Sequence, residues 1–208
     1  MAEPKTQAEE IHTLFPWLLH WTIADDRIGG FRSDAYALKT PEGTVMIDPL
    51  PLAVTAQAEL EGIVAIFMTH GNHQRSVWRF RRELGAPVYA PSDVRGLDEE
   101  PDVRFDEGSP LPGNLRAMRA TGFREACYLG FMHEDGTAVL FCGDLITQDP
   151  RGPYRFPVEP SYFDPTGGVD DAERLLELPF STLCAAHAAP TLNGCQRALR
   201  KALEQATE

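Results

Sequence analysis

The chain has 208 residues, 43% of them hydrophobic and 24% charged, which is typical of one folded domain and not of a disordered segment. Its formal net charge of -12 disfavours nucleic acid and anionic membrane surfaces as partners. The polar tail 1–10 has no signal-peptide pattern, and no run of about 18 apolar residues occurs, so a cytoplasmic protein is expected.

The first half of the chain predicts a β-hairpin followed by α/β units. The expected elements are an apolar segment at 14–22, strands at 35–39 and 45–47, a helix at 52–60, a strand at 63–68, a helix at 76–84 and a strand at 87–90. Four arginines lie between Arg75 and Arg82, with a spacing typical of the solvent face of a helix. Gly85 is expected to end this helix.

The second half repeats this order after a loop-rich stretch at 93–114. The expected elements are strands at 103–105, 115–118, 126–131 and 137–141, a helix at 169–176, a strand at 182–186 and a helix at 195–205. The segment 149–168, rich in proline, glycine and aromatic residues, either covers a cleft or packs on the surface. Two sheets with helices outside are therefore expected.

The four cysteines are scattered, and no Cys-x-x-Cys pair is present. They are Cys127, Cys142, Cys184 and Cys195. Because they lie mostly in apolar, strand-like runs, we expect buried thiols, as in a reducing cytoplasm.

Three polar residues follow apolar strands directly: His70, Asp144 and His187. The ends of strands are where α/β folds place their chemistry, although each residue alone is weak evidence. A strand-end histidine is often only a hydrogen-bonding residue, and an aspartate there is often a cap or turn former. Three such residues in register predict a functional site.

In order and context, these segments resemble the metallo-β-lactamase superfamily from about residue 33 to 190. Similar motifs surround the strand-ending Asp48, the segment Phe67-Met-Thr-His70, the segment Phe141-Cys-Gly-Asp144 and the segment Ala186-His187-Ala-Ala-Pro190. The resemblance implies a single α/β domain over 1–208, a four-layer αββα sandwich of two mixed sheets packed face to face with helices outside.

Several of the family's metal ligands are replaced. Asn72, Gln74 and Arg75 stand where the family has a histidine, an aspartate and a histidine, and Phe123 takes the place of another histidine. The resemblance leaves three ligands, namely His70, Asp144 and His187. His70 belongs to one metal position and His187 to the other, with Asp144 bridging, so each position keeps two ligands. Catalytic zinc normally has three, and no tightly bound metal is expected.

His73 and Arg75 decide what the altered site can do. On the family pattern His73 is a spacer that points elsewhere, unless it swings in as a substitute ligand. A buried Asp144 without metal needs a compensating charge. We expect Arg75 to approach Asp144 or to fill the vacated metal volume, with Asn72 and Gln74 bonding to His70 or His187. The alternative is that Arg75 faces solvent.

The sequence favours a metallo-β-lactamase-fold protein whose degenerate metal site has become a polar pocket. The pocket residues would be His70, Asn72, His73, Gln74, Arg75, Phe123, Asp144 and His187. Such a pocket would bind an unknown small molecule or catalyse a metal-free, hydrolase-like reaction, without a cofactor.

Two other functions stay open. The first is a metal-dependent hydrolase with an unusual mononuclear site of His70, Asp144 and His187, holding zinc, iron or manganese. The second is a noncatalytic interaction protein, with the acidic surface and the aromatic segment 154–163 as its interface. No feature of the sequence selects a substrate or an oligomeric state.

Overall fold

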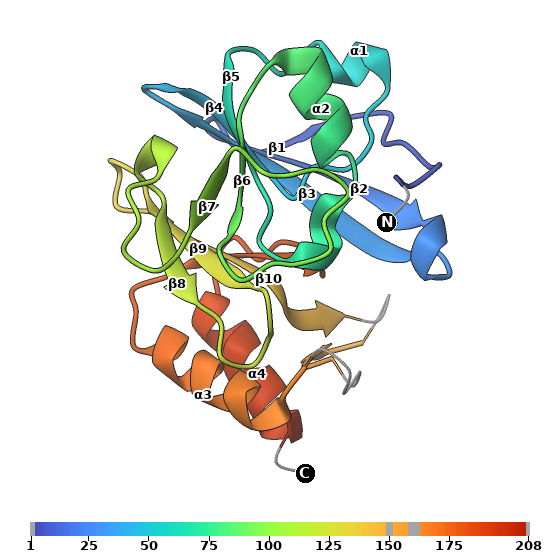
Figure 1. Ribbon diagram of the computed structural model, residues 1–208. Helices are drawn as coiled ribbons and strands as arrows, with labels where there is room; N and C mark the ends of the chain where they lie inside the picture. Colours follow the sequence, from blue (N-terminus) through green and yellow to red (C-terminus); the bar gives the residue numbers. More distant parts are fainter. Residues whose placement is uncertain (1–2, 149–151, 158–162, 207–208) are drawn as a thin grey trace.

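Two mixed β-sheets pack face to face, and helices cover both outer faces, in a computed structural model that describes residues 3–148, 152–157 and 163–206 (Figure 1). The expected αββα sandwich is confirmed. Among the described residues, no helix has both the length and the apolar character needed to span a bilayer.

The first sheet has seven strands, arranged side by side in chain order. They are β1 (His12–Phe15), β2 (Leu18–Asp25), β3 (Phe31–Thr40), β4 (Gly43–Ile47), β5 (Ile63–Phe67), β6 (Val88–Pro91) and β7 (Val103–Phe105). The first four strands pair antiparallel, and β4 to β7 pair parallel. The predicted hairpin is therefore confirmed as β3 and β4.

The second sheet has five strands, with β10 at its centre. They are β8 (Arg116–Arg119), β9 (Cys127–Met132), β10 (Ala138–Gln148), β11 (Tyr154–Arg155) and β12 (Thr182–His187). The strand β12 pairs parallel to β10, and the other pairs are antiparallel. A register irregularity at Gly143, whose φ is 51°, interrupts the pairing of β10 with β12 just before Asp144.

Helices pack on the outside of each sheet (Figure 1). They are α1 (Val54–Gln57), α2 (Val77–Leu84), α3 (Pro165–Leu176) and α4 (Cys195–Ala206), with short 3₁₀ turns η1 (Asp26–Ile28), η2 (Gly71–Gln74) and η3 (Pro112–Asn114). Gly85 ends α2 in the left-handed conformation, as expected. In α2 the apolar residues Val77, Trp78 and Phe80 are buried, and the expected amphipathic helix is confirmed.

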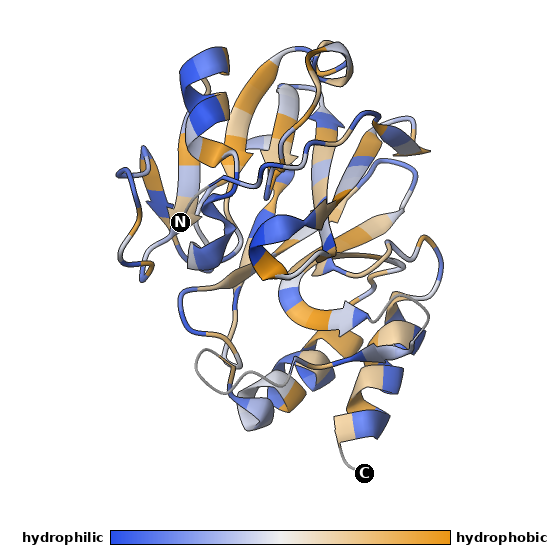
Figure 2. Cartoon of the chain, turned by 90° about the vertical axis from the view of Figure 1, so that its right-hand side faces the viewer, coloured by the Kyte–Doolittle hydropathy of each residue, from blue (hydrophilic) through white to orange (hydrophobic). Residues whose placement is uncertain are grey.

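The apolar core forms three layers of packed side chains. One lies between the first sheet and α2, one between the two sheets, and one between the second sheet and α3 with α4. Figure 2 shows hydrophobic stretches along the strands and alternating hydrophilic and hydrophobic segments along the helices. All four cysteines are free and buried, as predicted.

Several element boundaries differ from the expectation, and three of them have a clear local cause. The helix expected at 52–60 is only Val54–Gln57, because the backbone tightens into i to i−3 hydrogen bonds at Glu59 and Leu60. The helix α3 begins at Pro165, four residues early, because Asp164 caps it and accepts a bond from the Thr166 backbone N–H. The strand β10 continues to Gln148, so Asp144 lies within it.

Two glycines explain why α3 lies so close to the loop after β8. A Cβ atom at Gly167 would come within 2.6 Å of the Thr121 backbone, and one at Gly122 within 2.4 Å of Gly168. This part of the segment 149–168 therefore packs against the loop that carries Phe123. Residues 149–151 and 158–162 of that segment lie outside the described residues.

Candidate functional site

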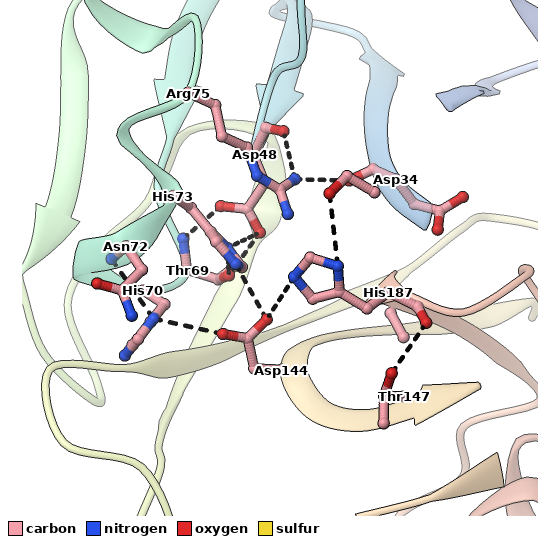
Figure 3. Close-up of polar contacts among 12 residues, drawn as sticks. Asp34, Asp48, Thr69, His70, Asn72, His73, Arg75, Asp144, Thr147 and His187 are labelled. Carbon is pink, nitrogen blue, oxygen red and sulfur yellow. Dashed lines mark hydrogen bonds and ion pairs between the residues drawn. The ribbon is translucent and has the colours of Figure 1, made fainter. Parts of the chain in front are cut away.

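The candidate site lies where strand ends from both sheets meet (Figure 3). His70 follows β5, Asp48 follows β4, and His187 ends β12. Asp144 reaches the same place from within β10. The predicted convergence of His70, Asp144 and His187 is present in the structure.

The Asp144 carboxylate is the centre of the cluster, because three imidazole rings turn a nitrogen toward it. His73 Nε2 lies 3.0 Å from Oδ1, His187 Nε2 lies 3.3 Å from Oδ1, and His70 Nδ1 lies 3.4 Å from Oδ2. The expectation that His73 points elsewhere is wrong. His73 is three positions after His70, and the 3₁₀ turn η2, with about three residues per turn, brings both side chains to the same side.

The second nitrogen of each ring is held by another acceptor. His73 Nδ1 lies 2.9 Å from Oδ2 of Asp48, and His187 Nδ1 lies 2.8 Å from the backbone carbonyl oxygen of Arg32. The His70 ring makes a hydrogen bond to the backbone of Arg124. These partners fix the ring orientations, so that each ring presents its remaining nitrogen to Asp144.

Asp48 is itself fixed by hydrogen bonds from Thr69. Its carboxylate accepts hydrogen bonds from the Thr69 backbone N–H at 2.8 Å and from the Thr69 hydroxyl at 2.5 Å. Burial alone would raise the pKa of Asp48, but the charges of His73 and Arg75 and these hydrogen bonds lower it below the usual value. Asp48 is therefore a buried carboxylate that fixes His73.

The surroundings shift the pKa values of His70 and His73 in opposite directions. Burial lowers the pKa of His70 despite the nearby Asp144 charge. For His73, burial and Arg75 oppose ionisation, but the two flanking carboxylates raise its pKa overall. Burial would also raise the pKa of Asp144, yet the charge of His73 and hydrogen bonds from His187 and His73 hold it well below its usual range. Without a metal, the two carboxylates thus favour the protonated form of His73.

Arg75 is buried, with 3% of its surface exposed, so the solvent-facing alternative is wrong. Its Nη1 donates to the backbone carbonyl oxygens of Asp34 at 2.8 Å and Asp48 at 3.1 Å. The hydrogen bond expected between Arg75 and Asp144 is not among the described contacts of this guanidinium. The charge of Arg75 nevertheless acts on both Asp48 and Asp144.

The other expected pocket residues divide into those at the cluster and those turned away. The Phe123 ring lies 6.2 Å from the His70 ring and 4.7 Å from the Phe163 ring, so it forms an aromatic wall. Asn72 is exposed, and its backbone N–H contacts His70 Nδ1 at 3.4 Å. Gln74 points away, because its Oε1 accepts bonds from the Trp78 indole at 2.9 Å and the Asp98 backbone at 2.7 Å.

Sequence reasoning placed Asp48 in a motif but gave it no role in the site, and it missed Thr69 and Arg32. The position of Asp48 at the end of β4, beside β5, was a usable signal, because neighbouring parallel strands end side by side. Arg32 contributes only a backbone oxygen to His187, and no side-chain pattern announces that contact.

Among the described residues, one group of side chains could hold a metal ion. Ligand atoms of His70, His73 and Asp144 all lie within 4.8 Å of one another. Tetrahedral zinc with ligands at its usual bond lengths separates them by about 3.3 Å. His73 Nε2 lies 3.0 Å from Oδ1 of Asp144 and His70 Nδ1 lies 3.4 Å from its Oδ2, so both nitrogens lie close to this carboxylate. Two imidazoles and a carboxylate are also suitable ligands for zinc or iron.

Solved structures similar to this chain include metallo-β-lactamases. The enzyme from Pontibacter korlensis matches with a TM-score of 0.73 and 16% identity, over 96% of this chain and 99% of its own. The one from Erythrobacter litoralis matches with a TM-score of 0.74 and 14% identity, over 95% of both chains. The one from Hirschia baltica matches with a TM-score of 0.70 and 13% identity, over 97% of this chain and 98% of its own. The chain therefore has the metallo-β-lactamase fold.

Comparison by sequence adds no relative: no family model and no curated protein matches the chain. At these identities the structural likeness defines the fold, and the function has to be argued from the site.

Proposed function

We propose that the protein is a metal-dependent hydrolase with a mononuclear site, in which His70, His73 and Asp144 hold one divalent ion such as zinc. This ligand set differs from that of the mononuclear alternative in the sequence analysis, because His73 takes the place of His187. One observation carries the proposal: three imidazole nitrogens face Asp144, and each ring is oriented by an acceptor on its opposite side.

The contact between His70 and Asp144 favours a cation between them. The His70 ring bonds to the Arg124 backbone, and burial favours its neutral form, in which Nδ1 carries a lone pair that also accepts the Asn72 backbone N–H at 3.4 Å. That lone pair lies 3.4 Å from Oδ2 of Asp144, which is also an acceptor. Two acceptors at this distance repel each other, whereas a metal ion between them would attract both.

Asp48 would tune the metal ligand indirectly. Its contact with His73 Nδ1 leaves Nε2 as the free donor atom toward the ion. A carboxylate behind a metal-bound histidine fixes the ring and raises its basicity. Thr69 in turn holds Asp48 through two hydrogen bonds, so the ligand is preorganised through a chain of buried contacts.

When bound, the ion would lower the pKa of a water molecule and polarise the bond to be hydrolysed. His187 is suited to move the proton. Its Nδ1 lies 2.8 Å from a backbone carbonyl oxygen, which fixes the ring, and its Nε2 lies 3.3 Å from Oδ1 of Asp144. With 23% of its side chain exposed, His187 is more accessible than His70 or His73. Phe123 and Phe163 would give the substrate an apolar surface beside this chemistry.

A zinc titration of metal-stripped protein by calorimetry tests the proposal. We expect one zinc ion per chain, and binding at least about 10-fold weaker in His73→Ala, because one of three ligands is removed. His12→Ala is the matched control, since His12 is exposed and outside the cluster. Absence of zinc binding to folded wild-type protein would refute the proposal, as would equal affinity of the His73→Ala variant.

A metal-free binding pocket is the second candidate. The charges of the side chains in the cluster favour it. Arg75 and His73, when His73 is protonated, would together balance the charges of Asp48 and Asp144 without an ion. A pocket of this kind needs no metal, so it would tolerate the replacement of the family's other metal ligands. The same titration separates the candidates, because only the hydrolase requires zinc to bind at His73.

A further inference from the structure

Two donor atoms of Arg75 are unpartnered inside the protein. Within the described residues, Nε and Nη2 are buried and have no hydrogen-bond partner, whereas Nη1 donates to two backbone carbonyls. A guanidinium cannot lose its charge under ordinary conditions. Buried and unpaired donors on a charged group cost free energy, and native proteins rarely leave them without a function or a ligand.

The charged groups around Arg75 would have a net positive charge when a divalent ion binds. Asp25 pairs with Arg27, and Asp34 pairs with Arg32, so these four groups cancel. That leaves the carboxylates of Asp48 and Asp144 against Arg75. With one divalent cation and neutral histidines, the cluster carries one excess positive charge, which a bound anion would neutralise.

The Arg75 guanidinium is directed toward the cluster. Figure 3 shows the Arg75 guanidinium beside Asp48 and Asp34, directed toward the space between His73 and His187. The side chains of Asp144 and His187 are 13% and 23% exposed, so solvent reaches the cluster at these two residues. An anionic group that enters past His187 would approach the free edge of the guanidinium.

We propose that Arg75 binds an oxyanion of the substrate, the carboxylate or phosphate group of a small molecule, next to the metal cluster. Guanidinium groups bind such oxyanions through paired N–H donors, and Nε with Nη2 form one such pair. The inference rests on the proposed function for the ion, but Arg75 carries its own charge and donors. Oxyanion binding is therefore expected to persist, more weakly, in metal-free protein.

The test is a calorimetric titration of the full chain with inorganic phosphate and, separately, acetate, each with and without stoichiometric zinc. We expect binding in the zinc-loaded wild type and at least about a 10-fold loss of affinity in Arg75→Met, since a charge-assisted pair is removed. Arg82→Met is the matched control, because Arg82 is an exposed arginine of α2, 62% exposed and paired with Glu99. A preference for one anion identifies the substrate group.

The outcomes separate this inference from the proposed function. If zinc does not bind but phosphate or acetate binds through Arg75, the metal proposal fails and the oxyanion site stands. If zinc binds and neither anion does, or if Arg75→Met binds them as tightly as the wild type, the oxyanion site is refuted. Should Arg75→Met not fold, NMR of arginine Nε–H groups in the wild type decides. The signal protected from solvent exchange must shift on anion addition, and its invariance would overturn the proposal.

Discussion

His73 Nδ1 lies 2.9 Å from Oδ2 of Asp48, and both side chains are almost completely buried. This contact turns the other nitrogen of the ring toward Asp144. A residue at a spacer position of the sequence motif thereby becomes a member of the cluster.

Asp48→Asn should weaken zinc binding by about 10- to 100-fold, the usual effect of losing a carboxylate behind a metal-bound histidine. The amide keeps the size of the side chain but removes the charge that orients and polarises His73. Competition with a zinc-binding dye measures the affinity. Asp135→Asn, at an exposed hairpin turn, serves as the control. An unchanged affinity in folded Asp48→Asn would show that His73 needs no such support.

The metal-free protein should lose stability as the pH rises above about 6.5, the ordinary pKa of histidine. The folded state raises the pKa of His73, so its contribution is complete below the unfolded value and disappears as the pH rises through the folded one. Urea unfolding at several pH values, with zinc removed by a chelator, measures this slope. His73→Gln should flatten it, and an equally steep slope in that variant would contradict the assignment.

The buried thiols should resist alkylation until the protein unfolds. Burial raises the pKa of Cys127 and Cys195 to about 12, so almost no thiolate is present at pH 8.5. Iodoacetamide followed by mass spectrometry should give no labelling of either residue in native protein and full labelling in urea. Rapid native labelling of Cys127 would show that this part of the core opens readily.

Asp171→Asn should destabilise the fold by about 2–4 kcal/mol, because a buried charged acceptor is lost. The Asp171 carboxylate accepts hydrogen bonds from the Tyr128 hydroxyl, the Thr121 hydroxyl and the backbone N–H groups of Thr121 and Gly122. Urea unfolding compares this variant with Asp170→Asn, an exposed neighbour. Equal stabilities of the two variants would show that the contacts of Asp171 are not needed.

The layered fold was predictable because its signals are local. Apolar strands, helix ends such as Gly85 and hairpin turns each follow from a few neighbouring residues. The positions of His70 and His187 followed from the ends of their strands. The side-chain directions at His73, Gln74 and Arg75 did not. They depend on the 3₁₀ turn η2 and on a φ of 32° at Arg75, which neighbouring sequence does not specify.

Crystals of zinc-loaded protein, with anomalous diffraction recorded at the zinc edge, test the central claim most directly. We predict a single anomalous peak with His70 Nδ1, His73 Nε2 and an Asp144 oxygen at about 2.0–2.2 Å. Loaded crystals with no peak at this position, or with a peak that His73 does not ligate, would contradict a mononuclear site built on His70, His73 and Asp144.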